Sequence, residues 1–127
     1  MIEFHYNYRS DDIILSITPI ILLLWFNIVN NINKILILLV IISSLIYWNN
    51  KNIYTFLFDT LAAILFIIYN LFELNKKYSL THCIYLIIIL LLFFTYSYIN
   101  GQNGTKQLLY HLIFRFMCFV IFILSIS

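Results

Sequence analysis

Five long apolar runs, separated by short polar breaks, make up most of the chain. The runs lie at about residues 13–29, 35–48, 53–72, 83–99 and 108–126. A helix that crosses the hydrocarbon core of a bilayer needs roughly 20 apolar residues, with a range of about 17–25. The last three runs meet this length, the first is marginal, and the second is short unless Lys34 and the flanking Asn residues extend it by snorkelling. The pattern predicts an all-α, polytopic transmembrane helical bundle with about five spans, or four if run 35–48 does not cross fully.

The composition also favours a membrane protein. Apolar residues make up 64% of the 127 residues and charged residues only 9%, whereas a soluble domain has about 25% charged residues. So few polar side chains cannot cover a water-facing surface. In lipid the backbone must satisfy its own hydrogen bonds, and continuous apolar runs favour helices over the alternating strands of a barrel. We therefore expect residues 1–127 to form a single integral membrane domain in contact with the lipid bilayer.

The basic residues do not orient the chain in the membrane. With five spans, three lie on each side: Arg9, Lys51 and Lys106 on the first, and Lys34, Lys76 and Lys77 on the second. This even split leaves the positive-inside rule without a preferred orientation. The net charge of +2 is too small to indicate a nucleic-acid partner.

Two charged residues fall inside the apolar runs. Asp59 and Arg115 each lie six or seven residues into a run that starts from the first side, so both are expected roughly 10 Å below that surface. Arg115 shares one helical face with Gln107 and His111. These four residues form the predicted intramembrane polar cluster, with an Asp59–Arg115 ion pair at its centre. Possible contributors from the other runs are Ser16, Ser43, Ser44, Thr95 and Ser97.

Three roles are compatible with Asp59 and Arg115. They form a structural ion pair within the chain, or pair with a neighbouring subunit, or belong to a proton or ion path with Asp59 as the carrier. A carboxylate paired with an arginine is held ionised and carries no mobile proton at neutral pH, which favours the structural role.

The sequence contains no motif that indicates a catalytic, metal or cofactor site. Cys83 and Cys118 are far apart and belong to no Cys/His cluster. His82 and His111 begin helices on opposite sides, so they cannot hold one haem together. A nucleophile elbow, an HExxH motif, a P-loop and a GxGxxG motif are all absent. We expect no enzymatic activity in the chain itself, no soluble substrate, no metal and no cofactor other than structural lipids.

The residue usage suggests a subunit of a larger assembly. Close packing of membrane helices favours small residues, yet the chain has two Gly, two Ala and no GxxxG motif. Residues with AT-rich codons, such as 12 Phe and 10 Tyr, far outnumber those with GC-rich codons. Both features predict an accessory subunit of a multi-subunit respiratory-chain or ATP-synthase complex, encoded by an AT-rich organelle genome and located in the mitochondrial inner membrane. The alternatives are a viral or bacterial membrane, and a small proton, ion or solute transporter with a polar pocket around Asp59, His111 and Arg115.

Overall fold

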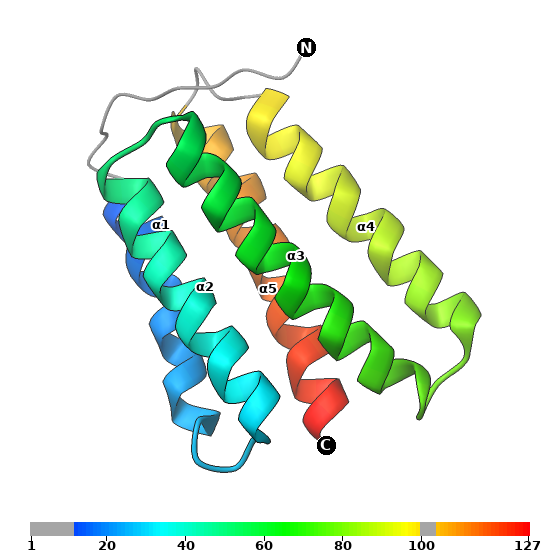
Figure 1. Ribbon diagram of the computed structural model, residues 1–127. Helices are drawn as coiled ribbons and strands as arrows, with labels where there is room; N and C mark the ends of the chain where they lie inside the picture. The colour runs from blue at the N-terminus through cyan, green and yellow to red at the C-terminus, as the bar shows by residue number, and fades with distance from the viewer. Residues whose placement is uncertain (1–11, 100–103) are drawn as a thin grey trace. The chain divides into compact units, whose positions relative to one another are not determined.

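The computed structural model describes residues 12–99 and 104–127, and every element in these two ranges is helical. The elements are α1 (Asp12–Ile17), the 3-10 helix η1 (Thr18–Trp25), α2 (Asn31–Asn49), α3 (Ile53–Asn75), α4 (Leu80–Ile99) and α5 (Gly104–Ile126) (Figure 1). The predicted all-α class is confirmed.

Within the described residues, four helices are long and apolar enough to cross a membrane, namely α2, α3, α4 and residues Thr105–Ile126 of α5. The chain is therefore an integral membrane protein, and its fold matches a helical bundle of four to five spans. Run 35–48 belongs to a longer helix, because α2 has 19 residues and includes Lys34 and the flanking Asn residues. Asn30 caps the helix by accepting a hydrogen bond from the Asn33 N–H at 2.9 Å, so part of the polar break before this run is the first turn of the helix.

The first apolar run forms α1 and η1 instead of one α-helix, and Asp12–Trp25 is shorter than the four spans. Pro19 explains where the α-helix ends. Proline has no N–H, and its ring clashes with the carbonyl four residues earlier in an α-helix. The regular α-helix stops at Ile17, and Pro19 takes a position in the first turn of η1.

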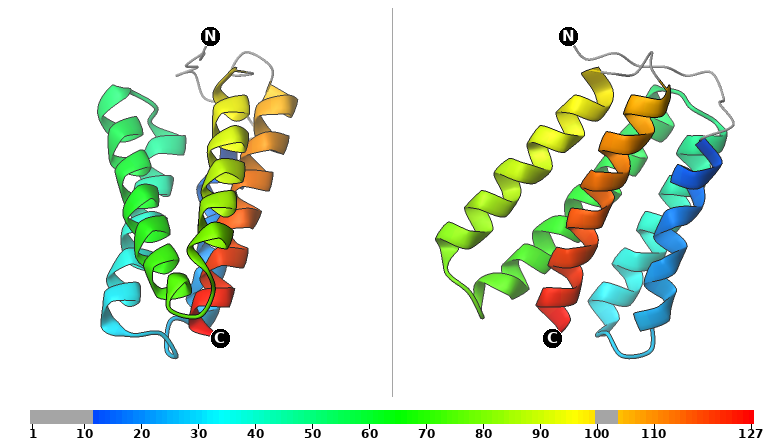
Figure 2. Two further views of the ribbon diagram at one scale, coloured as in Figure 1. Left: turned by 90° about the vertical axis from the view of Figure 1, so that its right-hand side faces the viewer. Right: turned by 180° about the vertical axis from the view of Figure 1, so that it is seen from behind.

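The described residues form two compact units, one ending at Phe66 and one beginning at Ile67. In the first unit α1 packs along α2, and η1 also contacts α2 (Figure 2). The largest fully buried side chains of this unit are Trp48, Tyr47, Leu15 and Ile37. The first unit is thus built around a hairpin of α1 and η1 against α2.

In the second unit α4 and α5 lie side by side, as both views in Figure 2 show. Its hydrophobic core is formed by the buried residues Leu71, Leu74, Cys83, Leu90, Phe114 and Ile121. The core therefore combines the end of α3 with both helices of the α4–α5 pair.

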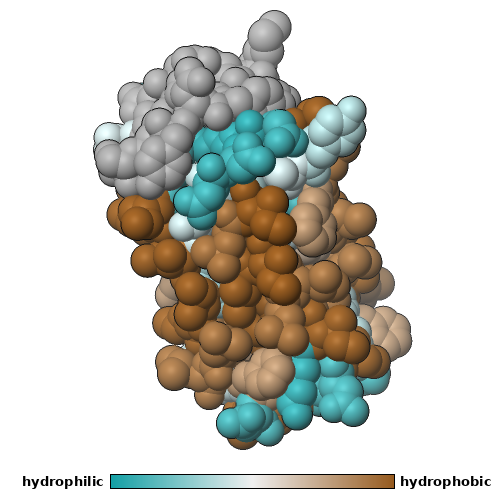
Figure 3. Space-filling view, turned by 60° about the vertical axis from the view of Figure 1, so that its left-hand side comes forward, coloured by the Kyte–Doolittle hydropathy of each residue, from teal (hydrophilic) through white to brown (hydrophobic). Residues whose placement is uncertain are grey.

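The helices also expose large apolar side chains, as a lipid-embedded surface requires. Leu24 is 76% exposed, Ile28 is 73% exposed and Phe116 is 63% exposed. On the face drawn in Figure 3, hydrophobic residues fill the middle and hydrophilic residues gather toward the ends. This surface suits acyl chains or the apolar helices of a partner.

Candidate functional site

A buried ion pair joins the start of α1 to the residues that follow α2. Lys51 Nζ lies 2.6 Å from Asp12 Oδ2, and the two side chains are 1% and 4% exposed. The same Nζ lies 4.9 Å from the centroid of the Trp48 ring, a distance at which a cation is attracted to the aromatic face. The charge of each residue is therefore compensated within the hairpin.

A second polar contact lies where Pro19 follows the end of α1. In a continuous α-helix the N–H of residue 19 would donate to the Leu15 carbonyl, and proline has no such donor. Ser44 of α2 donates its hydroxyl to the Leu15 carbonyl at 2.9 Å, in a fully buried position. In lipid, neighbouring hydroxyl side chains satisfy the carbonyls that a helix-breaking proline releases. Ser44 therefore both supports the break and attaches α1 to α2.

Asp59 of α3 is linked to α2 through Ser43. The Ser43 hydroxyl lies 3.3 Å from Asp59 Oδ1 and 3.1 Å from the Val40 carbonyl. Ser43 is fully buried, whereas Asp59 is half-buried. The geometry places this carboxylate against α2 at Ser43, whereas the adjacent Ser44 contacts α1.

In the second unit a neutral polar pair joins α4 to α5. Ser97 Oγ lies 3.1 Å from His111 Nδ1, and both residues are buried. The imidazole ring is surrounded by the rings of Phe94, Tyr98 and Phe114, whose centroids lie 5.6–6.4 Å away. The surroundings of His111 are those of a histidine packed and hydrogen-bonded within a core.

A second neutral contact joins α3 to α5. Ser125 Oγ lies 2.6 Å from Asn70 Oδ1 and also 2.8 Å from the Phe122 carbonyl. Nearby, Lys77 Nζ donates to the carbonyls of Ser125 at 2.7 Å and Ser127 at 2.5 Å. A cation near the last carbonyls of a helix satisfies them and interacts favourably with the helix dipole.

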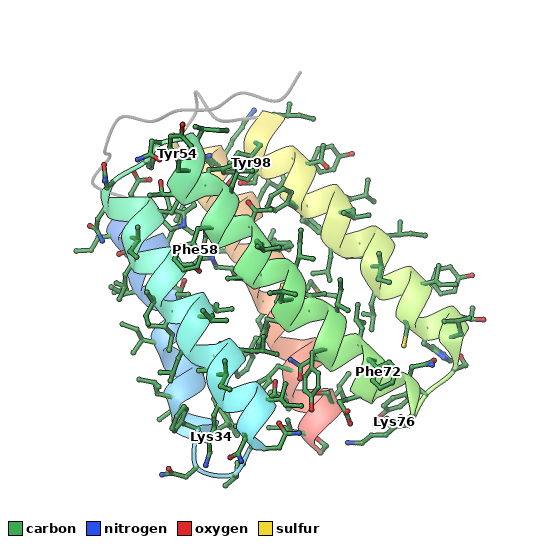
Figure 4. All side chains as sticks on the ribbon, in the orientation of Figure 1. Lys34, Tyr54, Phe58, Phe72, Lys76 and Tyr98 are labelled. Atoms are coloured by element: carbon green, nitrogen blue, oxygen red, sulfur yellow. The ribbon has the colours of Figure 1, made fainter. Side chains whose placement is uncertain are left out.

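Lysines near the helix ends also lie on aromatic rings. Lys76 Nζ is 5.1 Å from the Phe72 centroid and 3.1 Å from Glu73 Oε1, just beyond the end of α3 (Figure 4). Lys34 Nζ, in the first turn of α2, is 5.7 Å from the Phe26 centroid. Such residues extend their stems along apolar surface while the charged head reaches the headgroup region. They mark helix ends and not a binding site.

The predicted site residues fall in both units. Gln107 and His111 are buried and Arg115 is half-buried, all on α5, whereas Asp59 belongs to the other unit. The Asp59–Arg115 ion pair would join the two units, and it stays a prediction.

The structure places the five possible contributors differently. Ser43, Ser44 and Ser97 make the contacts described above. Ser16 donates locally to the Ile13 carbonyl at 2.9 Å, and Thr95 is exposed on α4.

Two buried contacts join residues that lie outside the predicted site, namely the Asp12–Lys51 ion pair and the Asn70–Ser125 hydrogen bond. The signal for the ion pair is present, because antiparallel neighbouring runs bring residues 12 and 51 to the same side. For Asn70 and Ser125 the signal is that each lies on the polar face of its own helix.

The described residues contain no group of three or more His, Cys, Asp or Glu side chains that could hold a metal ion. Cys83 is buried, Cys118 is half-buried, and both are free thiols. Comparison with known proteins finds no protein family, no curated protein and no solved structure that matches the chain. The functional argument therefore rests on the geometry of the polar contacts.

Proposed function

We propose that the chain is an accessory, structural subunit of a large multi-subunit membrane complex, with no catalytic activity of its own. The observation that carries this proposal is that the buried polar side chains contact one another or the backbone of a neighbouring helix. Asp12 with Lys51, Ser44 with Leu15, Ser97 with His111 and Asn70 with Ser125 each join neighbouring helices of the same unit.

Contacts of this kind are expected of a scaffold. Polar side chains inside a membrane protein either pair with one another or line a path for a solute or proton. The Asp12–Lys51 pair is almost fully removed from solvent, and the His111 imidazole is enclosed by aromatic rings. Both arrangements favour packing over transport.

The outer surface supports a role within a larger assembly. The exposed residues of the spans are predominantly large and apolar, and the chain has only two Gly and two Ala residues. Partner helices can cover such a surface with complementary large side chains, although GxxxG-type close contacts are not available to them. The complex we propose is a respiratory-chain or ATP-synthase assembly of the mitochondrial inner membrane, and the abundance of residues with AT-rich codons supports this location.

Affinity purification in a mild detergent tests the proposal. The tagged chain should co-purify with larger membrane proteins in a fixed ratio and migrate with them in a native gel. A Lys76→Gln variant, altered only at an exposed lysine that contacts Glu73 and Phe72, should co-purify in the same ratio. A chain that purifies alone and conducts protons or ions when reconstituted into liposomes would contradict the proposal and support the transporter hypothesis.

A further inference from the structure

We infer that residues 12–28 cross the membrane as a fifth span, in which 3-10 winding compensates for the small number of residues. This segment includes the six residues of α1 and the eight of η1. Fourteen residues of ordinary α-helix are too few to cross a bilayer, and for this reason the segment differs from the four longer helices.

The winding supplies the missing length. An α-helix rises 1.5 Å per residue, so α1 is about 9 Å long. A 3-10 helix rises about 2.0 Å per residue, so η1 is about 16 Å long. After η1, the N–H of Phe26 bonds to the Leu23 carbonyl at 3.2 Å and that of Ile28 to Trp25 at 3.1 Å. This continues the three-residue pattern and adds about 6 Å.

The resulting length matches the membrane. Residues 12–28 reach about 31 Å, and the hydrocarbon core is about 30 Å thick. The same residues in a continuous α-helix would reach only about 26 Å.

The length of α2, the helix that packs against this segment, gives a second estimate of how far residues 12–28 extend. Both α1 and η1 contact α2, which has 19 residues and is therefore about 28 Å long. The turn before Asn31 closes one end of this hairpin, and the Asp12–Lys51 ion pair closes the other. With the turn at one end and the ion pair at the other, residues 12–28 extend along the whole of α2.

The segment also meets the chemical requirements of a span. No charged residue occurs between Asp12 and Lys34. Ser44 satisfies the Leu15 carbonyl at the Pro19 break. The outward side chains are large and aliphatic, and those more than 35% exposed are Ile13, Ile14, Ile17, Ile20, Ile21, Leu23, Leu24 and Ile28. Lipid acyl chains are the environment that this surface fits.

A distance measurement in bilayers tests the winding. Spin labels at Ile13→Cys and Ile28→Cys, in a Cys83→Ala/Cys118→Ala background, should be about 28 Å apart along the helix axis. A matched pair at Asn31→Cys and Ile46→Cys has the same sequence separation within α2 and should be about 22 Å apart. Equal distances for the two pairs would overturn the 3-10 account.

Labelling of sealed vesicles with a membrane-impermeant maleimide tests the crossing. Single-cysteine variants at Asn27 and Asn50 carry the thiol at opposite ends of the hairpin, and both positions are exposed. The maleimide therefore identifies which side of the vesicle each end faces. A spin label at Ile13→Cys should be quenched by a relaxation agent added on the Asn50 side. Quenching from the Asn27 side would show that residues 12–28 do not cross, and would overturn the inference.

Discussion

The two units of the chain join their helices with different polar chemistry. In the first unit the contact at the helix ends is an ion pair between Asp12 and Lys51. In the second, the fully buried contacts Ser97–His111 and Asn70–Ser125 are neutral, and the charged contact of Lys77 with the carbonyls at the end of α5 is only partly buried. Removing a charge from water costs far more than removing a hydroxyl, so a buried charge must be matched by its partner. The comparison predicts that the stability of the first unit falls steeply when one ion pair is broken. The stability of the second unit should fall only slightly when any one of its neutral contacts is removed.

Removing one charge of the Asp12–Lys51 ion pair should have the largest effect on the stability of the protein. Lys51→Met leaves the Asp12 carboxylate buried without its cation, which should lower the free energy of unfolding by about 3–5 kcal/mol. Unfolding by SDS in mixed micelles measures the change.

An exposed ion pair in the same chain provides the control for Lys51→Met. Lys76 and Glu73 lie 3.1 Å apart with side chains 59% and 30% exposed, and Lys76→Met should cost at most about 1 kcal/mol. Equal losses for the two variants would contradict the comparison.

The predicted Asp59–Arg115 ion pair should have the next largest effect, because it would connect the units. A double-mutant cycle with Asp59→Asn and Arg115→Gln should give a coupling free energy of about 1–3 kcal/mol. Additive effects of the two substitutions would show that the residues do not pair.

The contact at the Pro19 break should have a smaller effect. Ser44→Ala leaves the Leu15 carbonyl without this hydroxyl and should destabilise the protein by about 1 kcal/mol. Ser16→Ala, which removes only a bond to the carbonyl three residues earlier, should cost less. Pro19→Ala restores a backbone N–H and should reduce the cost of Ser44→Ala, whereas an undiminished cost would argue against the repair.

The neutral pair of the second unit should have the smallest effect. Ser97→Ala should cost about 0.6 kcal/mol, the average for hydrogen bonds between membrane helices. The double variant Ser97→Ala/His111→Phe keeps an aromatic ring among Phe94, Tyr98 and Phe114 and should be close to wild type. If Ser97→Ala alone lowered the free energy of unfolding by several kcal/mol, the neutral contacts of the second unit would matter as much as the ion pair of the first, which contradicts the comparison.

Helix positions could be predicted from the sequence because the apolar runs are long. The run at 53–72 predicts α3 with an error at its C-terminal end alone, and the predicted end at residue 99 matches α4. The start of α2 was missed because Asn31 and Asn33 are polar, yet they lie in a capped first turn. Polarity at a helix start is compatible with either a break or a cap, and the geometry of Asn30 decides between them.

The polar contacts were harder to predict than the helices. The stripe of Gln107, His111 and Arg115 indicates which face of α5 is polar, but it does not show that His111 contacts Ser97. That contact depends on the rotation of α4, which the nearly uniform apolar sequence of the helix leaves undetermined. The η1 helix was missed for a related reason, because Pro19 predicts a break in the α-helix but not the winding that follows it.

Exchange of the two charges tests most directly whether the polar pairs hold the helices together. The variant Asp12→Lys/Lys51→Asp keeps both charges and reverses their positions, and its unfolding in SDS is compared with that of each single variant. Our account predicts that the exchanged protein recovers most of the stability that either single substitution removes. An exchanged protein that is no more stable than the single variants would show that the ion pair does not hold α1 against α2.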